Sequence, residues 1–224
     1  MRTTLLSDFK DYYDHAFDVK GDSFVRKKTH EMSRSDIIDF LSDKGFRVPP
    51  HGQVRNFVIN MSKKATANDV EVLLDHYLMV VYENSHDHDG YGKQLILARQ
   101  ALEEYPTCFY TEYAGKLPSF SIKFVQIGNR RWWFKCESKN DWRSNWGETS
   151  VELLGEDPPG WAYNIPYPMF SVDFVIPSDD DWTNFWATDF NRYPNLIDLK
   201  FDRILEPEEV VDLLKQGIKK YSLD

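Results

Sequence analysis

Two stretches in the last third of the chain are rich in large apolar residues, and each contains a single carboxylate. Phe170–Ile176 reads FSVDFVI and contains Asp173, and Asn184–Asn191 reads NFWATDFN and contains Asp189. A polar, acidic segment with turn-forming residues separates them. Short apolar runs bounded by such a segment are typical of buried strands. The pattern therefore predicts a hairpin of two strands, each of which carries a carboxylate.

Periodic patterns predict further elements along the rest of the chain. The clearest is a helix over residues 33–45, in which an apolar stripe follows a serine suited to the N-cap, Ser33 or Ser35, and Gly45 ends the helix. The other expected elements are helical segments at 53–77 with a break at 62–66, a strand at 77–82, a helix at 94–105, a strand at 109–114, a hairpin of 119–127 with 131–136, and a helix at 207–221. The acidic, proline-containing residues 148–167 are expected to be irregular.

Composition narrows the class of protein. The 224 residues are 42% hydrophobic and 15% aromatic, enough for one large core or two small lobes. A formal net charge of −9 argues against a nucleic-acid-coating surface, and no apolar run is long enough for a membrane span or a signal peptide. Cys108 and Cys136 are too few for a disulfide framework and suit a reducing compartment. We therefore expect a cytoplasmic protein without nucleic-acid or membrane partners.

The carboxylates of the predicted hairpin are candidate metal ligands. Asp189 and Asn191 are two residues apart and project from the same face of their strand, and Asp173 on the neighbouring strand can reach the same point. Two carboxylates and an amide form an all-oxygen set that suits Mg²⁺ better than zinc. The alternative from the residues alone is that one aspartate caps a turn while the others are solvated on an open face.

A glycine-containing polar loop at residues 84–93 lies between a predicted strand and a predicted helix. Gly90 and Gly92 allow backbone N–H groups to approach an anion, and Lys93 follows them directly. Strand, glycine loop and helix in this order are suited to covering a phosphate. Most Gly-x-Gly-Lys sequences, however, are simple turns.

The most specific motif of the chain is Asp141-Trp142-Arg143-Ser144-Asn145, which follows Lys135 on a predicted strand. A basic residue followed by Asp-aromatic-Arg-Ser-Asn resembles the glutamate-adding branch of the ATP-grasp ligases, which usually have Arg where Lys135 stands. The resemblance implies that Arg143 and Lys135 bind the transferred phosphate. It also implies that Lys123 matches a basic position on the preceding strand and that Asn145 assists at the metal end.

Further residues match the same family in the same order. Asp173, followed by Asp189-x-Asn191-x-x-Pro, resembles its metal-binding end, which usually has Glu where Asp189 stands, and implies that these three residues bind Mg²⁺. The positions implied in nucleotide binding are Arg34, in place of a first lysine, and Glu112 with Tyr113, at the hinge strand that binds adenine. Tyr82 stands where the family has a second lysine, a charge that Lys93 is placed to supply.

The resemblance implies an α+β, ATP-grasp fold whose two lobes hold a nucleotide between antiparallel sheets. It divides the chain into a reduced N-terminal segment (1–32), a helical entry with the small nucleotide-binding lobe (33–114), and a large lobe with the metal and phosphate site (115–224). The short N-terminal segment is similar to that of the very small ATP-grasp proteins of bacteriophages, which would place the chain in the host cytoplasm.

The function that this resemblance implies is an ATP- and Mg²⁺-dependent carboxylate–amine ligase. Its substrates would be a carboxylate and an amine on an amino acid, peptide or protein. Because the N-terminal lobe that would select them is reduced, a partner protein is expected as a possible source of that lobe. Two alternatives stay open. Tyr82 and Asp189 depart from the family and favour a non-catalytic binding module, and a kinase on the same fold would stop after phosphoryl transfer.

Overall fold

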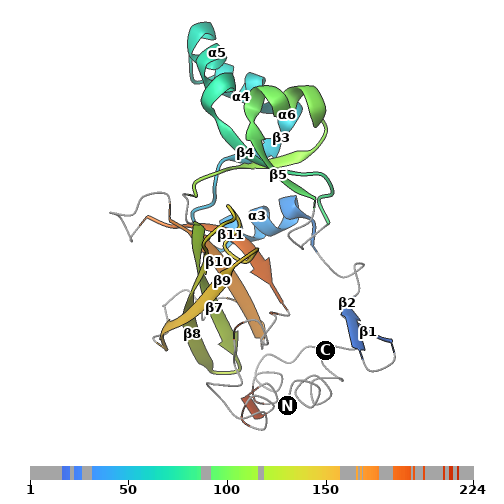
Figure 1. Ribbon diagram of the computed structural model, residues 1–224, viewed down its shortest axis with the longest axis vertical. Coiled ribbons are helices and arrows are strands. Elements are labelled where there is room, and N and C mark those ends of the chain that lie inside the picture. The colour runs from blue at the N-terminus through green and yellow to red at the C-terminus, as the bar shows by residue number, and fades with distance from the viewer. Residues whose placement is uncertain are drawn as a thin grey trace.

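A computed structural model of the protein contains two main antiparallel sheets, one of five and one of four strands (Figure 1). The structure describes residues 17–20, 23–26, 32–86, 92–115, 119–156, 165, 167, 169–176, 184–192, 194, 199, 209, 212, 213 and 216. The α+β class is thereby confirmed. The hairpin of β1 (Phe17–Lys20) and β2 (Ser23–Arg26) was not predicted.

The large sheet has the strand order β11-β10-β7-β8-β9. Its strands are β7 (Ser119–Ile127), β8 (Arg130–Ser138), β9 (Thr149–Gly155), β10 (Met169–Val175) and β11 (Trp186–Asn191). Residues opposite each other in an antiparallel pair share a face. One face of this sheet is apolar and includes Ile122, Phe124, Val172 and Phe174, which belong to a common buried cluster. The opposite face carries Lys123, Asp173 and Asp189, and we call it the polar face.

The small sheet has the strand order β3-β6-β4-β5. Its strands are β3 (His51–Gln53), β4 (Leu78–Tyr82), β5 (Lys93–Leu97) and β6 (Phe109–Glu112). The helical elements of this lobe are the 3₁₀ turn η2 (Val54–Asn56), α4 (Phe57–Ser62), α5 (Ala67–His76) and α6 (Ala98–Glu104). The helices lie on the outer side of the sheet, where Met79 and Val81 join Phe57 and Leu74 in one buried cluster (Figure 1). Val80 and Tyr82 point to the other side of β4, because side chains alternate along a strand.

Helix α3 (Arg34–Asp43) lies between the two sheets (Figure 1). Ser33 is its N-cap and forms a capping box with Asp36, whose backbone N–H donates to the serine hydroxyl while the carboxylate accepts from the Ser33 backbone N–H. Ile37 and Leu41 pack in the apolar cluster of the large sheet, whereas Ile38 packs against the small sheet. The helix is thus buried against both lobes.

Two predicted elements were wrong. Residues 94–97 are not the start of a helix but belong to β5, which pairs with β4, and α6 begins only at Ala98. Residues 149–155 are not irregular but form β9, an edge strand that pairs with β8. In both places a neighbouring strand supplies backbone partners that local sequence preferences do not reveal.

Most of the predicted C-terminal helix lies outside the described residues. Glu209, Asp212, Leu213 and Gln216 are helical, and Leu213 is buried. Gly128 in the β7–β8 turn has a φ of +59°, and a Cβ added there would lie 2.1 Å from the Leu213 carbonyl oxygen. A glycine is therefore required at this turn.

None of the described helices combines the length and the hydropathy that crossing a bilayer requires.

Candidate nucleotide and metal site

The three predicted metal ligands lie together at one end of the β10–β11 hairpin. Asp173 is directly opposite Asp189, and Asn191 follows two residues later on the same face. Thr188 is the extra residue of a bulge just before Asp189, and its hydroxyl donates to the Asp173 backbone carbonyl at 3.2 Å. The bulge sets the register that brings both carboxylates to the polar face.

Each carboxylate already has a basic partner from another element. Lys123 on β7, opposite Asp173 in the sheet, donates to the Asp173 carboxylate. Burial raises the pKa of Asp173 above its ordinary value, with the Lys123 charge opposing and the Asp189 charge adding to that shift. Burial lowers the pKa of Lys123, but attraction to Asp173 outweighs it and leaves that pKa raised. The lysine therefore stays protonated.

Arg34 connects the candidate metal ligands to the small sheet. Its Nη1 lies 2.8 Å from Asp189 Oδ1, and its side chain is only 2% exposed. Its guanidinium carbon is also 5.2 Å from the centre of the Tyr82 ring, and its backbone N–H donates to the Ser85 carbonyl at 2.7 Å. Attraction to Asp189 overcomes the effect of burial and raises the pKa of Arg34. A buried, charged residue thus joins β11 to the end of β4.

Lys93 lies on β5, directly opposite Tyr82. Its Nζ is 5.8 Å from the centre of the Tyr82 ring. Burial and the nearby charge of Arg34 lower the pKa of Lys93 to about 8, against the attraction of Asp189 and Asp173. In the part of the chain that the structure describes, no carboxylate forms an ion pair with Lys93.

The motif loop between β8 and β9 covers the polar face. Arg143 donates to both carboxylate oxygens of Asp141 at 2.8 Å, and its guanidinium carbon lies 4.4 Å from the Trp146 ring centre. The Ser144 hydroxyl is 2.6 Å from that of Ser121, a polar-face residue of β7. Asn145, by contrast, is exposed. The two hydrogen bonds to Asp141 and the cation–π contact with Trp146 orient the Arg143 guanidinium.

Lys135 does not join the other predicted phosphate ligands. It lies opposite Ile122 on β8, so its side chain projects from the apolar face rather than from the face of Lys123. There it pairs with Glu137 at 2.9 Å and lies over the Phe120 ring. The signal was present in the sequence, because a two-residue turn at Gly128-Asn129 pairs 127 with 130 and places 135 opposite 122.

The predicted hinge residues lie at the end of β6. Glu112 accepts a hydrogen bond from the Tyr77 hydroxyl at 2.9 Å. The Tyr113 ring packs edge-on against Trp142 at 6.0 Å, and its buried hydroxyl has no hydrogen-bond partner. Trp142 also packs against the buried cluster of Ile38, Val80, Tyr82 and Phe109, so the motif loop contacts the region between α3 and the small sheet. Gly92 has a φ of +69°, which favours glycine, whereas Gly90 lies outside the described residues.

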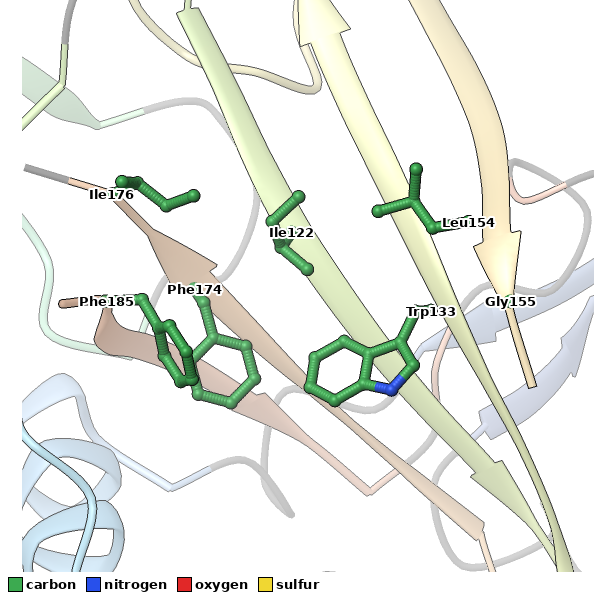
Figure 2. Close-up of a pocket in the computed structure, with 7 residues that line it drawn as sticks. All are labelled: Ile122, Trp133, Leu154, Gly155, Phe174, Ile176 and Phe185. Atoms are coloured by element: carbon green, nitrogen blue, oxygen red, sulfur yellow. The ribbon is translucent and has the colours of Figure 1, made fainter. Parts of the chain in front are cut away.

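A separate apolar pocket of about 280 Å³ lies on the other side of the large sheet (Figure 2). It is lined by Ile122, Trp133, Leu154, Gly155, Phe174, Ile176 and Phe185. Ile122 and Phe174 belong to the apolar face, so the sheet separates this pocket from the carboxylates. The pocket therefore forms no part of the candidate site.

The donor set fits a hard cation. Among the described residues no group of three or more His, Cys, Asp and Glu side chains gathers, so the candidate ligands are two carboxylates and the Asn191 amide. Ser171 lies opposite Asn191 and on the face of Asp173, and its buried hydroxyl oxygen has no hydrogen-bond partner among the described residues. Sequence analysis missed this oxygen, although its i, i+2 spacing from Asp173 would have indicated it. All four groups offer oxygen, as Mg²⁺ prefers.

Comparison with solved structures identifies the fold. The chain is similar to a RiPP-associated ATP-grasp ligase from Chryseobacterium gregarium, solved with ADP and with leader and core peptides (10% identity, TM-score 0.50, 81% of this chain and 56% of that chain). It is similar to the ATP-grasp ligase PsnB, solved with a precursor variant, Mg and ADP (11% identity, TM-score 0.53, 85% and 60%). It is also similar to the VanG D-Ala:D-Ser ligase from Enterococcus faecalis (13% identity, TM-score 0.50, 83% and 61%).

The chain therefore has the ATP-grasp fold, and it spans 56% to 61% of the length of these three proteins. No family model matches the sequence, and no curated protein matches it significantly. The likeness is thus one of structure rather than of sequence.

Proposed function

We propose that the protein is an ATP- and Mg²⁺-dependent ligase that joins a carboxylate to an amine. The observation that carries the proposal is the position of Asp173, Asp189 and Asn191 on the polar face. Lys93 lies close enough to both aspartates, to Arg34 and to Arg143 for their charges to act on it. Carboxylates for a cation and several bases for phosphates are the groups that phosphoryl transfer from ATP requires.

In this mechanism a carboxylate oxygen of the substrate attacks the γ-phosphorus of ATP, and ADP leaves. An amine then attacks the acyl carbon, phosphate leaves, and the amine loses a proton. Bound Mg²⁺ would neutralise phosphate oxygens and would be held by Asp173, Asp189 and Asn191. Arg143, oriented by Asp141, would hold the transferred group, and Lys93 with Arg34 would bind the nucleotide phosphates.

The nucleotide base would lie against the end of β6. Backbone groups near Glu112 and Tyr113 would bind adenine, and the Tyr113–Trp142 contact would close that end of the site. Trp142, Trp146 and the loop that carries them would exclude water from the acyl phosphate. By analogy with the ligases that were solved with peptides, we propose that the substrates include an amino acid or a peptide.

Calorimetry with a non-hydrolysable ATP analogue, with and without Mg²⁺, tests the first step. We expect micromolar binding to the wild-type protein that requires Mg²⁺ and weakens by at least about tenfold in Asp189→Ala, because one ligand is lost. Glu137→Ala is the matched control, since that carboxylate also pairs with a base but projects from the apolar face. Wild-type protein that binds no nucleotide would contradict the proposal.

ADP release then separates the remaining functions. A ligase releases ADP only when both a carboxylate and an amine are present, whereas a kinase needs one acceptor. A non-catalytic binding module is the second candidate, and the pairing of both aspartates with Lys123 and Arg34 favours it, because a cation must compete with those bases. Nucleotide binding without ADP release, over a broad screen of amino acids and peptides, would select this candidate.

A further inference from the structure

The Tyr82 ring contacts two basic side chains that come from different elements. The Arg34 guanidinium carbon lies 5.2 Å and the Lys93 Nζ 5.8 Å from the ring centre, both within the range of a cation–π interaction. The tyrosine is 6% exposed, and its hydroxyl lies 3.4 Å from the Thr111 hydroxyl. Burial raises the pKa of Tyr82, so the ring is a neutral phenol.

Backbone pairing fixes both cations to the end of β4. Lys93 is the direct cross-strand partner of Tyr82, so their Cβ atoms are about 5 Å apart. The Arg34 backbone N–H bonds to Ser85, three residues after the tyrosine. The ring therefore stands where α3, β4 and β5 meet, and both bases pack against it.

Lys93 differs from the other basic residues around the site because no described carboxylate neutralises its charge. Arg34, Lys123 and Arg143 each form an ion pair with a carboxylate. Among the described residues, none forms an ion pair or hydrogen bond with Lys93, and burial and the Arg34 charge lower its pKa. A half-buried ammonium that no described carboxylate neutralises is costly by itself and is suited to an anionic ligand.

We infer that Tyr82 is a positioning residue, whose ring holds Arg34 and Lys93 as a pair of cations for the phosphates of a polyphosphate ligand. The inference rests on the proposed function in identifying that ligand with the phosphate chain of ATP. A lysine at position 82 would place a third charge beside Arg34 and Lys93. The aromatic ring instead attracts both cations and adds no positive charge that would repel them.

Titration calorimetry with inorganic tripolyphosphate tests the role of the ring. We expect Tyr82→Phe, which keeps the ring, to bind within about twofold of the wild type, and Tyr82→Leu to bind about three- to tenfold more weakly. Val80→Ala is the matched control, because Val80 lies two residues earlier on the same strand face and in the same buried cluster. It should lower the melting temperature without changing the affinity.

Lys93→Met tests whether the lysine serves the ligand or the fold. We expect tripolyphosphate affinity to fall at least about tenfold, whereas the melting temperature rises by about 2 to 6 °C because a buried charge is removed. Lys93→Arg keeps the charge and should retain measurable binding. A structural lysine would give the opposite result, a lower melting temperature with unchanged affinity.

The inference is overturned if wild-type protein does not bind tripolyphosphate, or if folded Tyr82→Leu binds it as tightly as the wild type. It stands independently of turnover. Binding that depends on Tyr82 and Lys93 in a protein that never releases ADP would support the inference and contradict the ligase. ADP release with unchanged affinity in Tyr82→Leu would support the ligase and contradict the inference.

Discussion

At the scale of single residues, the candidate site is a set of partly or fully buried charges, of which one pairs with no carboxylate among the described residues. Asp173 and Asp189 are compensated by Lys123 and Arg34. Lys93 has no such partner in the described part of the chain, and its pKa is lowered to about 8. Groups with pKa values shifted by burial are frequent at functional sites, because function requires charges that folding alone would not retain.

Lys93→Met is expected to stabilise the protein by about 1 to 3 kcal/mol at pH 7. Below pH 8 this lysine is charged in both the folded and the unfolded chain, so the folded wild type carries the full cost of burying the charge. Between pH 8 and its ordinary pKa of 10.5 the folded protein loses the proton first, and the cost disappears. The advantage of the variant should therefore be full at pH 7 and nearly absent above pH 10.5.

Urea unfolding of both proteins at several pH values measures this difference. A gap that stays constant with pH would show that packing, rather than the ammonium charge, separates the variant from the wild type. A destabilised variant at pH 7 would contradict the prediction directly.

At the scale of elements, α3 has the largest influence on the site because it carries Arg34 in its first turn. The capping box between Ser33 and Asp36 determines where the helix begins, and so where the Arg34 side chain emerges. The sequence left Ser33 and Ser35 as alternative caps. The structure selects Ser33, whose side chain accepts the Asp36 N–H.

Ser33→Ala is expected to lower the free energy of unfolding by about 1 kcal/mol, because the helix loses its N-cap acceptor. Ser35→Ala provides the control, since it changes a serine inside the same first turn and should cost less than about 0.5 kcal/mol. Chemical denaturation of the two variants gives both values. Equal losses would contradict the assignment of the cap.

At the scale of the whole molecule, the two sheets are joined by α3 and by the Arg34–Asp189 ion pair. Helix α3 packs Ile37 against the large sheet and Ile38 against the small one. The ion pair extends this connection to β11, and the Arg34 guanidinium contacts β4 through Tyr82. The geometry of the site thus depends on a few residues of α3 that contact both sheets.

A double-mutant cycle with Arg34→Met and Asp189→Ala should give a coupling energy of about 1 to 3 kcal/mol for unfolding. Each single variant leaves a buried charge without its partner, so the double variant should be more stable than the sum of the single losses predicts. The exposed pair of Arg130 and Glu156 is the control and should couple by less than about 1 kcal/mol. Additive losses at Arg34 and Asp189 would contradict a connection through this pair.

Much of the fold could be predicted from local patterns, because the strands and helices that form its cores have strong periodicity or clear turns. The hairpin of β10 and β11 and the helix α3 are confirmed. Residues 94–97 and 149–155 were misassigned, because each becomes a strand only by pairing with the strand before it, which the local pattern does not reveal. For Lys135 the strand was predicted correctly, but the prediction did not consider from which face of the sheet the lysine side chain projects.

The sequence by itself determined the hairpin that carries Asp173 and Asp189 and the helix that carries Arg34. These follow from periods of two and 3.6 residues and from turn chemistry, which are local properties. Only the tertiary structure decided that Lys123 and Arg34 neutralise the two aspartates and that Lys93 packs with Arg34 on Tyr82. Contacts between segments distant in sequence depend on how the two sheets and α3 pack, and no local pattern encodes that packing.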